Sequence, residues 1–331
     1  MRRLVLIPLV ATLICGSRTL GPDDFSRGFD RFWETLDRTY PYFGVKGVDW
    51  DALRAEFRPQ VAAVQDATEL VALLAKLAAP LRDVHVFFTS PTGRHVPTYT
   101  PVAFVNWDLD VWRASLAGAG WTQVAPNLGY ARIAGVPYIL MAAWNRDQFT
   151  AAQVDGILER FRAAPGLILD VRPNGGGSDE LALDVAGRFT ASSVVVESYQ
   201  FRDGRNHDDF GNPVLRTLRP RGPWTFAGRV VVLSGRGVYS SNETFIAAMR
   251  ELPNVTIMGD TTGGATGNPG RHDLLEGWRF STSRWLARTA DGIVIEGQGI
   301  PPDVHVPATP EDRVARRDPV LDRARALIDE P

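Results

Sequence analysis

The sequence contains very little cysteine and very little lysine. Among its 331 residues, Cys15 is the one cysteine, and Lys46 and Lys76 are the only lysines, so arginine supplies nearly all of the 36 basic residues. A single cysteine excludes a disulfide framework and a cysteine-based metal site, and its place near the N-terminus excludes a cysteine nucleophile in the globular part.

The chain also lacks a surplus of either charge. Its 36 basic residues face 38 acidic ones, for a net charge of −2. Nucleic-acid binders normally carry a basic surplus, so we expect no nucleic-acid partner. A hydrophobic fraction of 44% with 22% charged residues is typical of a soluble globular protein, and the length fits one large domain or two smaller ones.

No apolar run is long enough to span a bilayer, but a shorter one lies at the N-terminus. Arg2 and Arg3 precede an apolar run from Leu4 to Cys15, and Gly16 and a serine follow. This is the pattern of a secretory signal over residues 1–17, and the run falls short of the roughly 20 residues of a membrane span. The alternative is a buried N-terminal strand or helix. We expect an exported protein, periplasmic or extracellular, without stable membrane insertion once the signal is removed.

Residues 23–83 carry apolar side chains at helical spacing. An aromatic stripe that begins at Phe25 predicts a first helix, Asp49 is placed to cap a second, and a third runs over 66–79 until Pro80 ends it. We interpret these residues as a helical N-terminal subdomain whose aromatic stripe forms its core.

Residues 84–310 change from strands and loops to an alternation of strands and helices. Buried strands that alternate with helices indicate a mostly parallel sheet covered on both faces. A C-terminal helix is expected within 311–331. The predicted strands are 84–88, 100–105, 130–133, 166–172, 194–198, 229–234 and 255–259, and the predicted helices are 151–163, 179–189, 241–252 and 319–328.

A glycine-rich turn follows one of these strands, in GLILDVRPNGGGSDE. Gly175–Gly177 stand between the strand and the next helix, where backbone N–H groups attract negative charge. The turn therefore indicates an oxyanion or phosphate cradle, or else only a tight connection between strand and helix. It is not a P-loop, because no lysine follows the glycines.

Two serines stand where another strand passes into a helix, in VVVLSGRGVYSSNETF. Ser240 and Ser241 would lie at the carboxyl edge of the sheet, as in a nucleophile elbow, although the G-x-S-x-G string is absent. The alternative is a helix cap in which Ser240 and Glu243 form a capping box.

A histidine and a glutamate complete the candidates. His85 lies in LRDVHVFF, two residues after Asp83, and Glu296 ends an apolar strand in IVIEGQGIPPDVHV. Glu296 could orient a histidine or be an exposed charge at a strand end. The other histidines show no metal-ligand spacing, so no metal and no cofactor are expected.

Taken in order, these segments resemble one family of serine peptidases. YPYF, VDWDAL, LRDVHV, LILDVRPNGGG, VYSSNETF, MGDTTGGATG and EGQGIPPDVHV, spread over residues 25–307, are similar to the family of C-terminal processing proteases, tricorn protease and interphotoreceptor retinoid-binding protein. The resemblance implies an α/β fold with a crotonase-like (ClpP/crotonase) core and a small helical N-terminal subdomain. A PDZ domain is not expected, since only about 45 residues separate His85 from Tyr130.

The resemblance also assigns roles. It makes Ser240 rather than Ser241 the nucleophile, His85 the general base and Glu296 the orienting acid, as in the tricorn-like branch. The oxyanion donors fall on the amides of Ser241 and Gly176.

Two positions depart from the patterns of the family. The branch that uses a lysine base is excluded, because Ala265 occupies the lysine position and neither lysine is expected near it. Val84 stands where tricorn has a relay serine. Glu296 could therefore reach His85 directly, through water or through another hydroxyl.

The resulting hypothesis is an exported serine peptidase that cleaves a peptide or protein substrate through an acyl-enzyme on Ser240. One alternative is a non-catalytic module that binds apolar ligands or peptides on the same fold. Another is acyl-CoA chemistry on a crotonase-type core, which the secretory signal disfavours because CoA is cytoplasmic.

Overall fold

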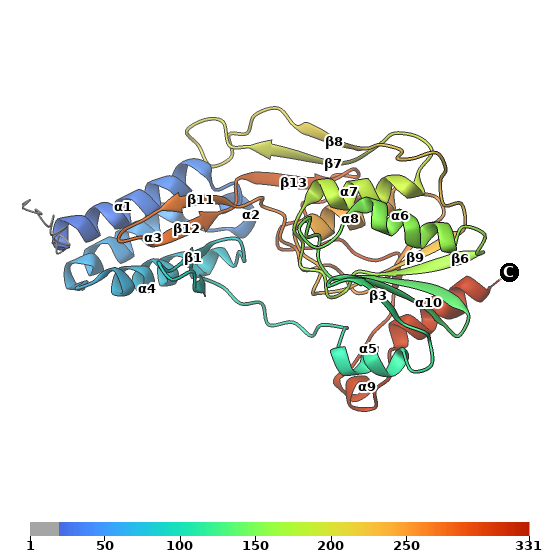
Figure 1. Cartoon of the computed structure of the whole chain (residues 1–331). Coiled ribbons are helices and arrows are strands. Elements are labelled where there is room, and N and C mark those ends of the chain that lie inside the picture. Colours follow the sequence, from blue (N-terminus) through green and yellow to red (C-terminus); the bar gives the residue numbers. More distant parts are fainter. Residues whose placement is uncertain (1–19, 331) are drawn as a thin grey trace, which may run out of the picture.

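The computed structural model describes residues 20–330, so the predicted signal and Cys15 lie outside the described residues. Figure 1 shows a helical lobe formed by the first part of the chain beside a larger α/β lobe. Within residues 20–330, no helix has both the length and the apolar character that a membrane span requires.

The helical lobe contains the three predicted helices and one additional turn of helix. Asp49 caps α3 by accepting a hydrogen bond from the Ala52 amide, and Asp66 caps α4 in the same way from Glu69. The aromatic stripe is buried, which confirms that it forms the core. The elements are α1 (Pro22–Thr39), α2 (Phe43–Lys46), α3 (Trp50–Phe57) and α4 (Ala67–Ala78).

Two distant parts of the chain build a small antiparallel sheet on these helices. Strands β1 (Phe87–Thr89) and β2 (His95–Pro97) pair in the order β11-β12-β1-β2 with strands β11 (Gly270–Asp273) and β12 (Arg279–Thr282). Phe32 of α1 lies 5.2 Å from the Phe88 ring and 5.0 Å from the Phe280 ring, so both segments close the same core. The strand predicted over 84–88 begins only at Phe87, because a turn precedes it.

The larger lobe is built on a seven-stranded sheet in the order β14-β10-β9-β6-β5-β4-β3. The five strands from β14 to β5 are parallel and the last two are antiparallel, which confirms the predicted mostly parallel sheet. The strands are β3 (Thr122–Ala125), β4 (Leu128–Ile133), β5 (Val136–Met141), β6 (Gly166–Asp170), β9 (Arg229–Ser234), β10 (Val255–Gly259) and β14 (Val304–His305).

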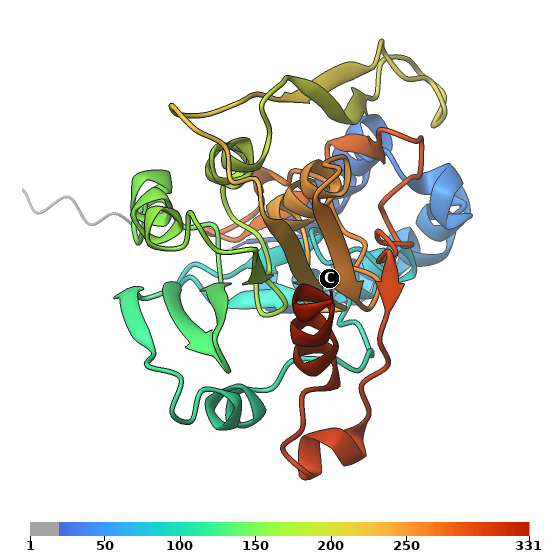
Figure 2. The ribbon, with the colours of Figure 1, turned by 90° about the vertical axis from the view of Figure 1, so that its right-hand side faces the viewer.

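Helices cover both faces of this sheet. Leu167 and Leu169 of β6 point to the core formed with α6 (Ala151–Arg160), α7 (Asp179–Ala186) and α8 (Ser241–Arg250). Ile168 between them points to the opposite core, formed with α10 (Pro319–Asp329). Figure 2 shows α10 beside the central strands. Two short helices, α5 (Leu109–Ser115) and α9 (Pro310–Val314), lie below (Figure 1).

Two segments differ from the prediction. Residues 201–221, where no helix or strand is predicted, contain β8 (Val214–Leu218), which pairs with β7 (Val194–Phe201) in a three-stranded sheet whose third strand is β13 (Trp285–Thr289). The prediction of a strand over 100–105 is wrong. That segment is an irregular connection between the lobes, because its apolar side chains find no sheet to cover and Val102 is fully exposed.

Candidate active site

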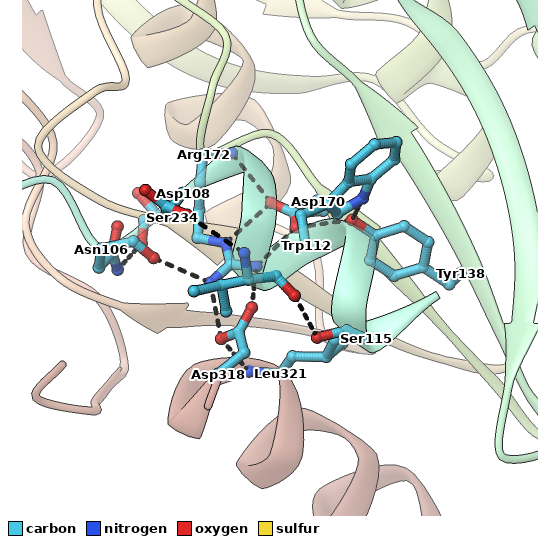
Figure 3. Close-up of polar contacts among 11 residues, drawn as sticks. Asn106, Asp108, Trp112, Ser115, Tyr138, Asp170, Arg172, Ser234, Asp318 and Leu321 are labelled. Atoms are coloured by element: carbon cyan, nitrogen blue, oxygen red, sulfur yellow. Dashed lines mark hydrogen bonds and ion pairs between the residues drawn. The ribbon is translucent and has the colours of Figure 1, made fainter. Parts of the chain in front are cut away.

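A buried arginine anchors the strand end that leads into the glycine turn. Arg172 donates four hydrogen bonds to the carboxylates of Asp170 and Asp318, at 2.7–2.9 Å, and one to the Asn106 carbonyl. The Tyr138 hydroxyl donates to Asp170 at 2.8 Å. Figure 3 shows how the network joins β6 to the N-cap of α10. The glycine turn therefore starts from a rigid support.

The turn has a fixed backbone path beside Trp144. The Trp144 amide donates to the Gly176 carbonyl, and the Ser178 amide donates to the Trp144 carbonyl. Gly177 has φ +136°, and a Cβ there would lie 2.1 Å from the Trp144 carbonyl oxygen, so only glycine fits. The Gly176 amide donates to the Asn174 side chain at 2.8 Å. Within the described chain, the Gly177 amide makes no hydrogen bond.

Ser240 stands on a strained turn between β9 and α8. Its φ of +57° and ψ of −130° are unusual for a residue with a side chain, and such strain clusters at functional sites. The Ser240 amide donates to the Ala265 carbonyl at 2.7 Å. Gly176 packs against this turn, because a Cβ on it would lie 2.8 Å from the Ser240 Cβ. The glycine turn and the Ser240 turn are therefore in direct contact.

The two serines have different environments. The Ser241 hydroxyl donates to the Gly177 carbonyl at 2.8 Å, whereas the Ser240 hydroxyl makes no hydrogen bond to any described residue. The alternative in which Ser240 caps α8 is therefore not what the structure contains. Glu243 instead accepts hydrogen bonds from the amides of Gly264 and Ala265, and burial raises its pKa to about 7.

His85 is buried at the edge of the helical lobe. Its amide donates to Asp83, and its Nδ1 lies 3.8 Å from an Asp83 oxygen without a hydrogen bond. Asp83 is itself held by the Ser283 hydroxyl at 2.7 Å. Burial lowers the pKa of His85, and the charge of Lys46 lowers it further against the opposing effect of Asp83. A neutral imidazole near neutral pH is the form that can accept a proton.

Glu296 lies close to His85 and carries an unexpected partner. Lys46 of α2 forms an ion pair with Glu296 at 2.7 Å, and both side chains are buried. Burial, followed by the charge of Asp83, raises the pKa of Glu296 well above its usual value, while Lys46 lowers it. The expectation that neither lysine lies near Ala265 is wrong, because Lys46 and Ala265 line the same cavity.

Two cavities flank the Ser240 turn. One of about 260 Å³ is lined by Lys46, Glu296 and Ala265, together with Val84 and Tyr239. The other, of about 460 Å³, is lined by Ser240, Ser241 and Gly177 among others. The structure thus brings His85 and Glu296 together and places Ser240 with the glycine turn.

Hydrogen bonds between the proposed catalytic residues are missing among the described residues. Across residues 20–330, no hydrogen bond joins His85 to Ser240 or to Glu296, and Val84 supplies no relay hydroxyl. In the absence of substrate, catalytic hydrogen bonds are often long.

A metal ion would have one place to bind among the described residues. Asp83, His85 and Glu296 each offer an atom within 4.8 Å of the others. However, Asp83 already accepts hydrogen bonds on both oxygens, and an ammonium group lies against Glu296. This arrangement suits proton transfer better than cation binding.

Known proteins share both the sequence and the architecture. Residues 135–306, more than half of the chain, match Peptidase family S41. The chain belongs to peptidase family S41. Residues 22–79 match the tricorn protease C1 domain, which places the helical lobe with the tricorn members of the family.

Individual relatives of the S41 family agree with this assignment. Tricorn protease homolog 1 of Streptomyces coelicolor is 31% identical over 207 residues, which are 61% of this chain and 17% of that protein. A crystal structure of a candidate peptidase from Parabacteroides merdae has a TM-score of 0.82 and 28% identity, and covers 94% of this chain and 98% of that one. Tricorn protease itself, at 14% identity and a TM-score of 0.60, shares the fold over 93% of this chain and 37% of its own.

Several residues that build the site of this S41 protein were not predicted from the sequence. Asn174, Asn242 and Lys46 gave no pattern of their own. Asn242 accepts from Trp144 and donates to the carbonyls of Val171 and Asn174, so it ties the glycine turn to α8. Asn174 opens the NGGG string and Asn242 lies in the SSNE string, so their places beside the two candidate motifs are the signal that could have indicated this contact.

Proposed function

We propose that this protein is an exported serine peptidase of the tricorn-like type, with a crotonase-like core and Ser240 as its nucleophile. The observation that carries the proposal is the strained Ser240 turn, whose free hydroxyl lies beside the glycine turn. The Ser240 hydroxyl makes no hydrogen bond to any described residue, and backbone strain of this kind clusters at functional sites. The N-terminal secretory pattern supports export to the periplasm or the extracellular space.

The reaction begins when the Ser240 oxygen attacks the carbonyl carbon of a peptide bond. His85 accepts the hydroxyl proton as the C–O bond forms, and the resulting imidazolium gives that proton to the leaving amine as the C–N bond breaks. Water then attacks the acyl-enzyme with the same histidine as base, releasing the acid and restoring Ser240. Glu296 compensates the imidazolium charge.

The amides around the glycine turn are the candidates for holding the oxyanion. Ser241 and Gly176 remain our proposed donors, and Gly176 would have to release its hydrogen bond to Asn174 to take this role. The Gly177 amide has no hydrogen bond to any residue from 20 to 330, and Gly177 lines the cavity with Ser240. The loss of one such donor typically costs about 2.7–4 kcal/mol of transition-state stabilisation.

Labelling by a fluorophosphonate probe tests the proposal, together with cleavage of a mixed peptide library. The intact protein is expected to be labelled and to cleave peptides, and Ser240→Ala is expected to abolish both. Ser241→Ala is the matched control, because it removes only the hydroxyl bonded to the Gly177 carbonyl and leaves the amide in place. Full activity of Ser240→Ala would contradict the assignment.

The alternative of a non-catalytic module that binds apolar ligands or peptides makes the opposite prediction. It expects ligand binding without labelling of either serine, and Ser240→Ala would leave that binding unchanged. The same labelling experiment therefore separates the two functions.

A further inference from the structure

The Lys46 side chain is buried although lysine is normally exposed. Its side chain is 6% exposed, and its Nζ contacts Glu296 Oε1 at 2.7 Å and donates to the Arg82 carbonyl at 3.2 Å. Burying an ammonium group is costly unless it is paired. A buried charge does not contribute to solubility, so the position of Lys46 between the two lobes points to a different role.

The two oxygens of the Glu296 carboxyl group have different contacts, and these indicate the role of Lys46. Lys46 occupies Oε1, while Oε2 is buried and has no hydrogen-bond partner among residues 20–330. Oε2 is therefore the oxygen that remains for His85, which shares a cluster with Glu296 and Asp83 within 4.8 Å. The position that supplies a relay hydroxyl in tricorn is Val84 here, so the orientation of Glu296 has to be fixed from another side.

We propose that Lys46 is a positioning residue, which fixes one oxygen of Glu296 and leaves the other for His85. This inference rests on the proposed function and adds a residue to it. Lys46 belongs to α2 of the helical lobe, and Glu296 follows β13, so the ion pair also fixes the distance between the two parts that form the cavity.

The other groups around Glu296 cannot replace Lys46. Asp83 and Glu243 are acids whose charges oppose ionisation of Glu296. The phenols of Tyr40 and Tyr42 are fully buried, and burial raises their pKa well above the usual value, so they stay neutral. His85 is neutral in the resting state that the reaction requires. Within the described part of the chain, Lys46 is the one cation paired with Glu296.

The test compares Lys46→Met with Lys46→Arg in the full chain. The measurements are kcat, KM and the rate of fluorophosphonate labelling across a pH series, with the thermal midpoint as a check of folding. Lys46→Met is expected to lower kcat roughly 10²-fold near neutral pH with little change in KM, as for a misplaced catalytic group. Lys46→Arg keeps the charge and is expected to retain most of the activity.

The pH profile separates positioning from a purely structural role. Without Lys46, Glu296 binds a proton more tightly, so the activity of Lys46→Met should recover as the pH rises and Glu296 ionises. Lys76→Met is the matched control, because Lys76 is the only other lysine and is exposed on α4. It should leave activity and profile unchanged.

A double variant provides the decisive result. Glu296→Gln removes the charge that Lys46 holds, so adding Lys46→Met to it should cause no further loss of kcat. Losses that multiply in the double variant would overturn the proposal. An unchanged pH profile in Lys46→Met with only a lower thermal midpoint would also overturn it. Equal inactivity of Lys46→Arg and Lys46→Met at every pH would instead indicate a lysine base. Failure of the proposed function is distinguished by Ser240→Ala, which does not involve Lys46.

Discussion

Replacing Arg172 by leucine should destabilise the protein more than an ordinary core substitution. Arg172 is fully buried and donates four hydrogen bonds to Asp170 and Asp318. Arg172→Leu leaves both carboxylates without their cation. Removing one partner of a buried ion pair typically costs about 3–5 kcal/mol, and two stranded acids place this variant near the upper figure.

Urea unfolding of the wild type and Arg172→Leu measures this difference directly.

A triple variant that combines Arg172→Leu with Asp170→Asn and Asp318→Asn removes every charge and should recover a large part of the loss. A deficit below about 1 kcal/mol, which is no more than a typical point substitution costs, would refute this account of the network.

Two further predictions concern buried groups that titrate. Burial raises the pKa of Glu197 to about 7 from a usual 4.5, so the stability it contributes below 4.5 is lost as the pH rises through 7. From acid to alkaline pH, the free energy of unfolding measured with urea should therefore fall less in Glu197→Gln than in the wild type. An equal fall in both proteins would contradict this. Because burial lowers the pKa of His85 below 6.5, the acid limb of kcat/KM should lie below 6.5, and a limb above that value would exclude His85 as the base.

The sequence predicts elements of this fold where the signal is local. The helix over 241–250 and the strands over 229–234 and 255–259 follow from apolar periodicity, and they appear within a few residues of their predicted ends. The sheet that joins Phe87–Thr89 to Arg279–Thr282 depends on pairing between segments nearly 200 residues apart, and no periodicity within either segment specifies that pairing.

The same distinction applies to the site. The Ser240 turn is indicated by its own residues, because the strand, the turn and the helix are contiguous. Lys46 pairs with Glu296 across 250 residues of sequence, and nothing around Lys46 points to an acid. The partner of an isolated charged residue becomes visible only when the two lobes are in place.

The small sheet in the helical lobe has a consequence for the order of folding. Its strands β11 and β12 are made well after helices α1 to α4, yet they close the core beside His85. A nascent chain that has not reached residue 282 can form helices α1 to α4 but cannot complete the pocket of the histidine. The pocket of His85 would therefore be completed only after β12 has been made, later than the helices of its own lobe.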